Sequence, residues 1–131
     1  MNDSEYDIYE DFYEALQQEY GELPEDNAYL ISQMILEIEE LEAQISLIQE
    51  QSDYFFDLEQ EKGDQAAEAS DLGNASENKE IQEFFYLKEE SLYEESERYF
   101  KKHLDKEDEI LALESKIDHL KTELEEMGFI Y

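Results

Sequence analysis

The sequence contains no cysteine and only two histidines, His103 and His119. Without cysteine the chain can form neither a disulfide framework nor a thiolate metal site. It also has no apolar run approaching the ~20 residues that a membrane-spanning helix needs. Its first residues lack the basic and apolar regions of a signal peptide. We therefore expect a cytoplasmic protein without a bound cofactor.

Positive charge is scarce as well. The chain has 9 lysine and arginine residues against 39 aspartate and glutamate residues, which gives a formal net charge of −30. Residues 1–61 hold 19 of the acids and no base, so all nine bases fall in residues 62–131. A charge of this size repels itself and destabilises a compact state. It also disfavours direct binding to nucleic acid or to an anionic membrane surface, and it favours a basic protein partner.

The aromatic content argues against a disordered acidic chain. The sequence has ten tyrosines and seven phenylalanines, and its large apolar residues recur with helical periodicity. We predict an all-α fold in a single domain. Its expected architecture is an elongated antiparallel helical hairpin or coiled coil, with a short N-terminal helix packed on it.

Apolar spacings of three and four residues predict three helices. The first is short and covers residues 4–20, and the two long helices cover 24–62 and 77–127. The segment between the long helices, residues 63–76, has few large apolar residues and contains two glycines. Because glycine and low hydrophobicity are typical of loops, we predict a mobile loop there.

Both long helices carry a heptad repeat, in which positions a and d form the apolar seam of a coiled coil. In the first long helix these positions hold Ile31, Met34, Ile38, Leu41, Ile45, Ile48 and Phe55. In the second long helix the regular part holds Ile110, Leu113, Ile117, Leu120 and Leu124.

The two long helices differ in predicted length, at roughly 55 Å and roughly 75 Å. The end of the second long helix therefore either projects or pairs with a second chain, and the seam over residues 110–127 is the candidate interface of a homodimer. Between residues 81 and 104 several large apolar residues lie off the heptad: Ile81, Phe84, Phe100 and Leu104. This irregularity predicts a broader aromatic bundle, formed where the first helix packs.

The density of carboxylates along the predicted hairpin is comparable to the charge density of a nucleic acid. A hairpin roughly 75 Å long with this charge carries about one charge per 2.5 Å, within a factor of about two of duplex DNA. In residues 5–14 tyrosines alternate with acids, and the rings either form the buried face of the first helix or fill pockets of a partner. The candidate partner-binding residues are Glu5, Asp7, Glu10, Asp11, Glu14, Glu37, Glu39, Glu40 and Glu42.

Enzymatic and metal-binding functions find little support. Two-carboxylate hydrolysis needs one carboxyl in a pocket that raises its pKa, and a thin hairpin offers no such cleft. A calcium loop counted from Asp64 fails at its third position, which is Ala66. Neither histidine follows a glutamate by three residues, as di-iron helical bundles require. We predict no catalytic residue and no specific metal site.

With its base-free run over residues 1–61 and its tyrosine–acid segment over 5–14, the chain resembles the DNA-mimic inhibitors of phages and mobile elements. These include anti-restriction and anti-CRISPR proteins. The resemblance is one of composition over the whole chain and involves no specific motif. It implies a non-catalytic inhibitor that occupies the basic nucleic-acid-binding surface of a defence nuclease or another DNA- or RNA-binding protein. It also implies residence in the host cytoplasm if the protein is phage-encoded.

Two other functions remain open at this point. In the first, the protein is a coiled-coil adaptor or structural protein, whose seam around Ile38, Leu41, Ile45 and Ile48 recruits a partner helix. In the second, it is a chaperone that binds several cationic proteins without discrimination.

Overall fold

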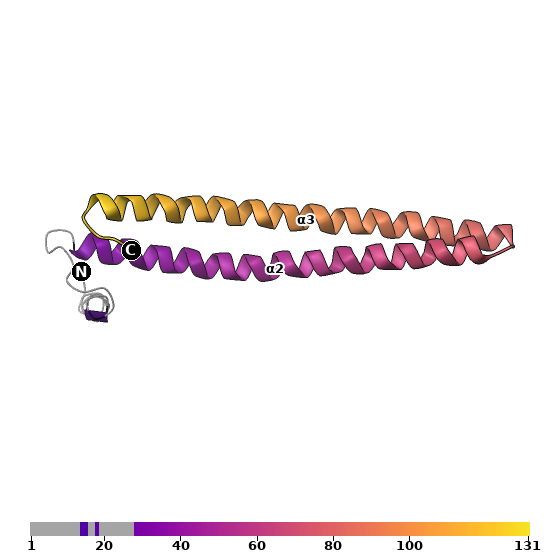
Figure 1. Ribbon diagram of the computed structural model, residues 1–131, viewed down its shortest axis with the longest axis horizontal. Coiled ribbons are helices and arrows are strands. Elements are labelled where there is room, and N and C mark those ends of the chain that lie inside the picture. The colour runs from indigo at the N-terminus through magenta and orange to yellow at the C-terminus, as the bar shows by residue number, and fades with distance from the viewer. Residues whose placement is uncertain (1–13, 16–17, 19–27) are drawn as a thin grey trace, which may run out of the picture. The chain divides into compact units, whose positions relative to one another are not determined.

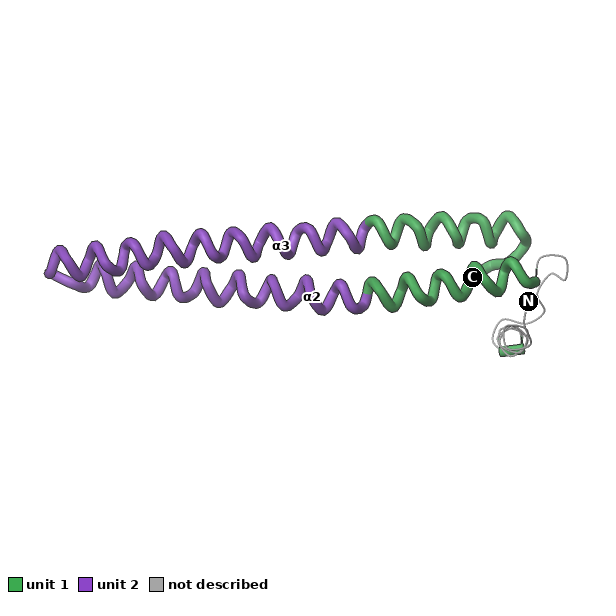
Figure 2. The backbone as a smooth tube through the Cα atoms, turned by 180° about the vertical axis from the view of Figure 1, so that it is seen from behind, with its two compact units in different colours: residues 1–45, 112–131 green, residues 46–111 purple. Residues whose placement is uncertain are grey.

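The computed structural model describes residues 14, 15, 18 and 28–131 (Figure 1). Helix α2 spans Ala28–Ala75 and helix α3 spans Lys79–Glu126. The two helices lie side by side and antiparallel, so they form the predicted helical hairpin, and the described residues contain no β-strand (Figures 1 and 2). The short helix predicted over residues 4–20 lies outside the described residues, except for the helical residues 14, 15 and 18.

The prediction of a mobile loop over residues 63–76 was wrong, because α2 continues through this segment to Ala75. The heptad of the preceding residues also continues, and it places Ala66, Ala69 and Gly73 at buried a and d positions. Alanine is the strongest helix former. The low hydrophobicity of the segment therefore reflects a seam built of small side chains and not a connector.

The longer α2 removes the expected mismatch in length. Each helix contains 48 residues, or about 72 Å at the rise of an α-helix. All twelve predicted seam residues are buried or half-buried. In the segment 110–127, Ile117 and Leu124 are packed in a core shared with α2. A homodimer through this segment would have to displace that packing.

One compact unit, hereafter unit 1, contains residues 28–45 and 112–131 of the described part of the chain (green in Figure 2). The core of its described part consists of large apolar side chains: Ile31, Met34, Ile35, Ile38, Leu41, Ile117, Leu124 and Phe129. Each fully buried side chain of this kind contributes about 1.5–3 kcal/mol relative to an exposed one. Unit 1 is therefore held mainly by hydrophobic burial.

The end of α3 also contributes to the core of unit 1. Gly128 has a positive φ of 86°, which glycine adopts without strain. Its N–H donates to the carbonyl of Glu125 at 3.0 Å, and the N–H of Phe129 donates to the carbonyl of Leu124 at 2.9 Å. This pair of bonds is a Schellman motif. It turns the apolar tail back, so that Phe129 is buried against Leu124.

Residues 46–111 form the second compact unit, unit 2 (purple in Figure 2). Its buried apolar cluster contains Ala66, Ala69 and Leu92, with Phe85 packed against them. A Cβ atom at Gly73 would lie only 2.8 Å from Cε1 of Tyr86, so the ring approaches α2 this closely only because residue 73 has no side chain. Small seam residues thus bring α3 close to α2 in this unit.

Residues 76–78 reverse the chain between the helices of unit 2. Asn78 caps the start of α3, because its side-chain oxygen accepts hydrogen bonds from the N–H groups of Glu80 at 2.9 Å and Ile81 at 3.3 Å. At the end of α2 the N–H of Ser76 donates to the carbonyl of Gly73 at 3.3 Å. These bonds satisfy helix ends that a short turn would otherwise leave unpaired.

Candidate partner-binding surfaces

The predicted partner-binding acids separate into described and undescribed residues. Five are exposed on helical residues: Glu14, Glu37, Glu39, Glu40 and Glu42. The other four lie outside the described residues: Glu5, Asp7, Glu10 and Asp11. Helical geometry pairs Glu37 with Glu40 and Glu39 with Glu42, because residues three apart are neighbours on a helix. The two pairs point in different directions from α2, so these four acids do not form one patch.

The acids of residues 28–61 have no basic partner within the described part of the chain. The ion pairs found there join Lys62 to Glu95 at 3.2 Å and Lys106 to Glu109 at 3.4 Å, so neither uses an acid of 28–61. Eight of the nine acids in this range are exposed. Their carboxylates are therefore accessible to a partner from outside the chain.

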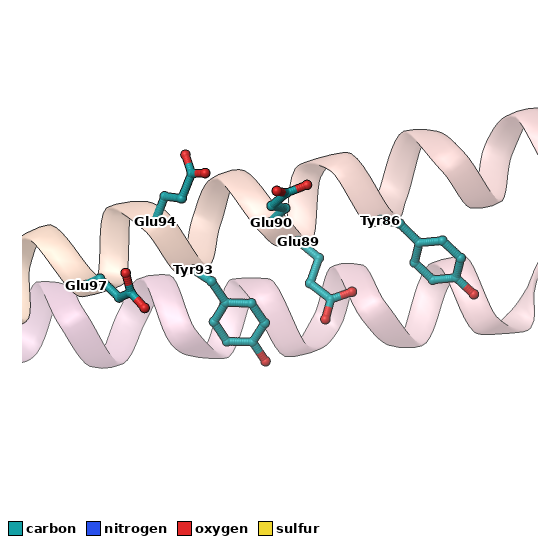
Figure 3. Close-up of a pocket in the computed structure, with 6 residues that line it drawn as sticks. All are labelled: Tyr86, Glu89, Glu90, Tyr93, Glu94 and Glu97. Atoms are coloured by element: carbon teal, nitrogen blue, oxygen red, sulfur yellow. The ribbon is translucent and has the colours of Figure 1, made fainter.

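A shallow open pocket of about 380 Å³ lies on α3 within unit 2. It is lined by Tyr86, Glu89, Glu90, Tyr93, Glu94 and Glu97. Figure 3 shows the rings of Tyr86 and Tyr93 projecting from the same side of α3. No basic side chain lines the pocket. Aromatic faces and carboxylates both attract cations, so this chemistry favours a lysine or arginine side chain.

The two tyrosines of the pocket begin a row of exposed apolar side chains, which we call the outer stripe: Tyr86, Tyr93, Phe100, Leu104 and Leu111. Their side chains are 42%, 47%, 43%, 44% and 61% exposed. Glutamates at 90, 97 and 107 fill the remaining positions of the row, so its spacing alternates between four and three residues. This is heptad spacing, and the row runs beside the α2–α3 seam, which it meets where Tyr86 lies against Gly73 and Glu107 accepts a hydrogen bond from Ser52.

Two members of this stripe lie off the heptad of α3, and the sequence predicted another environment for them. Phe100 and Leu104 were expected in a broader bundle, whereas the structure leaves them partly exposed on a second face of α3. The pocket residues were missed, because the search for acidic sites concentrated on the base-free half of the chain. The recurrence of tyrosine and glutamate at 86, 90, 93 and 97 is the pattern that would have located them.

A polar layer crosses the seam of unit 2 at Ser52, which is fully buried. The Ser52 hydroxyl donates to Oε1 of Glu107 at 2.6 Å and lies 2.9 Å from Nδ1 of His103. Nδ1 of His103 also lies 3.2 Å from the backbone carbonyl of Ser52. Because a carbonyl only accepts, Nδ1 carries the proton and donates to both oxygens of Ser52.

This layer differs from the arrangement of a nucleophilic triad. In a triad the imidazole lies between the serine and the carboxylate, so that it can remove the proton of the serine. Here the serine lies between the histidine and the carboxylate, and it has no access to solvent. A satisfied polar layer of this kind fixes the pairing register of a coiled coil.

No group of three or more histidine, aspartate or glutamate side chains in the described residues is arranged to hold a metal ion. No helix in that part of the chain is long and apolar enough to cross a membrane.

Comparison of the chain with protein-family models, with curated proteins and with solved structures finds no match. The candidate surfaces are therefore interpreted from their own chemistry.

Proposed function

We propose that this protein is a non-catalytic acidic inhibitor of the anti-CRISPR or anti-restriction type. It binds the basic nucleic-acid-binding surface of a defence nuclease or another DNA- or RNA-binding protein by charge mimicry. The observation that supports the proposal is the set of carboxylates of residues 28–61, which have no basic partner in the described chain and eight of which are exposed. A chain that used its acids for its own stability would pair them, because exposed like charges only destabilise it.

The spacing of these carboxylates is close to that of a nucleic acid strand. Nine acids lie in residues 28–61 of α2, a length of about 51 Å, which gives about one charge per 6 Å. Phosphates follow one another at ~3.4 Å along one DNA strand, so the two densities agree within a factor of about two. A groove lined with lysine and arginine attracts either charge distribution, and the attraction weakens as salt screens it.

The first test identifies the partner. The protein is immobilised, exposed to bacterial lysate at low salt and eluted with a salt gradient, and the captured proteins are then challenged with duplex DNA. We expect a nucleic-acid-binding protein that elutes early in the gradient and that DNA displaces. A captured protein that survives high salt and ignores DNA contradicts charge mimicry.

The second test uses the captured partner and charge-neutralised variants. The quadruple change Glu37→Gln, Glu39→Gln, Glu40→Gln and Glu42→Gln should weaken its binding at least about tenfold in Kd. A matched control removes the same charge where bases are present: Glu114→Gln, Glu123→Gln, Glu125→Gln and Glu126→Gln. Equal losses in the two variants would show that net charge alone matters and that α2 is not the binding element.

The adaptor function is the second candidate, and the structure changes where it would act. The seam residues expected to recruit a partner helix are already used within the chain, since Ile38 and Leu41 are buried in the core of unit 1 and Ile45 packs against them. An adaptor would therefore use another apolar surface, and the outer stripe is one such surface among the described residues.

A further inference from the structure

We propose that the outer stripe of α3 docks an amphipathic helix of the partner, whose apolar face is flanked by lysine and arginine. In this arrangement the pocket at Tyr86 and Tyr93 receives one of the cationic side chains. The inference rests on the proposed function, because it takes the partner to be basic. It adds the surface by which the partner is held and the kind of element that fits there.

The spacing of the stripe indicates a helical occupant. Its members follow the same alternation of three and four residues as the seam between α2 and α3, and the surface complementary to such a row is the apolar row of another helix. Soluble monomers rarely expose large contiguous apolar patches without a function. Five large side chains in one row, each at least 42% exposed, therefore suggest an unfilled interface.

The charge at the end of the stripe that holds Tyr86 and Tyr93 indicates a basic occupant, whereas Lys101 lies beside Leu104 farther along the row. Glu90 and Glu97 lie within the row, and Glu89 and Glu94 line the pocket beside it. A second copy of this chain would bring a formal charge of −30 to the same surface, and residues 1–27 of this chain hold ten acids and no base. Both would meet like charges, which destabilise an interface. A helix flanked by lysine and arginine would meet opposite charges.

The packing of unit 2 holds two aromatic members of the stripe, Tyr86 and Phe100, in place. The ring of Tyr86 lies against Gly73, and its hydroxyl donates to Oδ1 of Asn74 at 2.7 Å. The ring of His103 lies 6.5 Å from that of Phe100 and 5.6 Å from that of Phe56, measured between centroids. Side chains fixed before binding lose little entropy when a partner docks, which favours affinity.

The experiment uses two synthetic peptides as probes. The first is a three-heptad helix with leucine at positions a and d and with lysine and arginine on both flanks. The second has the same composition in scrambled order, so it has the same charge but no apolar row. Fluorescence anisotropy at physiological salt should show the amphipathic peptide binding at least about tenfold more tightly than the scrambled one.

Two triple variants locate the binding surface. Tyr93→Ser, Phe100→Ser and Leu104→Ser together should reduce the affinity for the amphipathic peptide to that for the scrambled peptide. The control makes the same kinds of change at more exposed apolar residues of unit 2 outside the stripe, Tyr54→Ser, Phe84→Ser and Leu87→Ser, and should keep the preference. Circular dichroism checks that both variants keep the helicity of the native chain. A loss of preference in the control variant overturns the assignment to the stripe.

The single change Tyr93→Leu tests the cationic pocket, because it keeps an apolar side chain and removes the aromatic face. It should lower the affinity for the amphipathic peptide by about threefold. An unchanged affinity would show that the pocket does not bind a cationic side chain.

The remaining outcomes separate the two proposals. If both peptides bind equally and salt releases both, the docking stripe is wrong while charge-based binding stands. If neither peptide binds even at low salt, the docking stripe is wrong, and the lysate capture with competing DNA then decides charge mimicry by itself. If the stripe variant instead converts a dimer of the chain to a monomer in sedimentation experiments, a second copy occupies the stripe and the basic helix does not.

Discussion

The two units of the hairpin fill the same kind of heptad seam with different side chains. In unit 1 the buried positions hold large residues such as Ile31, Ile38 and Leu124. In unit 2 they include Ser52 and Ala66, which are small or polar, and large residues such as Tyr93 and Phe100 remain partly exposed. Unit 1 also exposes large residues such as Leu36, so the units differ in what they bury, and the larger buried side chains of unit 1 should stabilise it more.

The largest effect is expected from a cavity in unit 1. Ile38→Ala should lower the free energy of unfolding by about 2–5 kcal/mol, because it removes a fully buried side chain from a close-packed core. Urea denaturation followed by circular dichroism measures the change. The control Leu36→Ala, at a residue 43% exposed, should change it by no more than about 0.5 kcal/mol. Similar costs for the two variants would contradict the view that burial in unit 1 dominates stability.

A smaller loss is expected from the polar layer of unit 2. Ser52→Ala removes the hydroxyl that donates to Glu107 and accepts from His103, and it should cost about 1–2 kcal/mol in the free energy of unfolding. Ser46→Ala, at an exposed residue of the same helix, serves as the control. If the Ser52→Ala variant is as stable as the Ser46→Ala variant, or more stable, the hydroxyl of Ser52 does not contribute to the free energy of unfolding.

Native-state hydrogen exchange compares the units directly. Backbone amides of residues 64–75 should exchange at least about tenfold faster than those of residues 31–41, because the small side chains of that seam bury less apolar area. The measurement is a mass-spectrometric or NMR exchange time course on the native chain. Equal protection in both segments would show that close helix approach offsets the smaller buried area.

The smallest effects are expected at the two glycines of α2. A Cβ at Gly63 would meet Oγ of Ser96 at an ordinary 3.9 Å, so Gly63→Ala should stabilise the chain by about 0.5–1 kcal/mol. Gly73→Ala should stabilise the chain less or not at all, because the Tyr86 ring must move and lose its hydrogen bond to Asn74. Thermal denaturation of the two variants gives the comparison, and equal gains would mean that the Tyr86 ring is free to shift.

The helical hairpin was predictable from the sequence where the seam residues are large. The isoleucines and leucines between Ile31 and Ile48 indicate the heptad because they are large and apolar, and those after Ile110 do the same. The segment 63–75 obeys the same heptad, but Ala66, Ala69 and Gly73 carry too little apolar surface to reveal it. Counting the register forward from Phe55, without regard to side-chain size, would have extended the helix correctly.

The candidate surfaces were only partly predictable. The exposure of Glu37 and Glu42 follows from their positions outside the seam. Whether a second apolar row is covered depends on what else packs against the helix, and a helical pattern does not contain that information. Phe100 and Leu104 were therefore recognised as irregular but assigned to a bundle, and the pocket at Tyr86 and Tyr93 is indicated in the sequence only by the recurrence of tyrosine and glutamate.

The short turn at residues 76–78 has a consequence for how such a chain can change in length. The turn fixes which heptad of α2 faces which heptad of α3, and Ser52 opposite His103 marks one such pairing. Losing seven residues from one helix alone would slide every later pairing by about 10 Å along its neighbour. Losing one heptad from each helix at facing positions would leave the remaining pairs matched. Insertions and deletions in relatives of this chain should therefore occur as matched heptads, one in each helix.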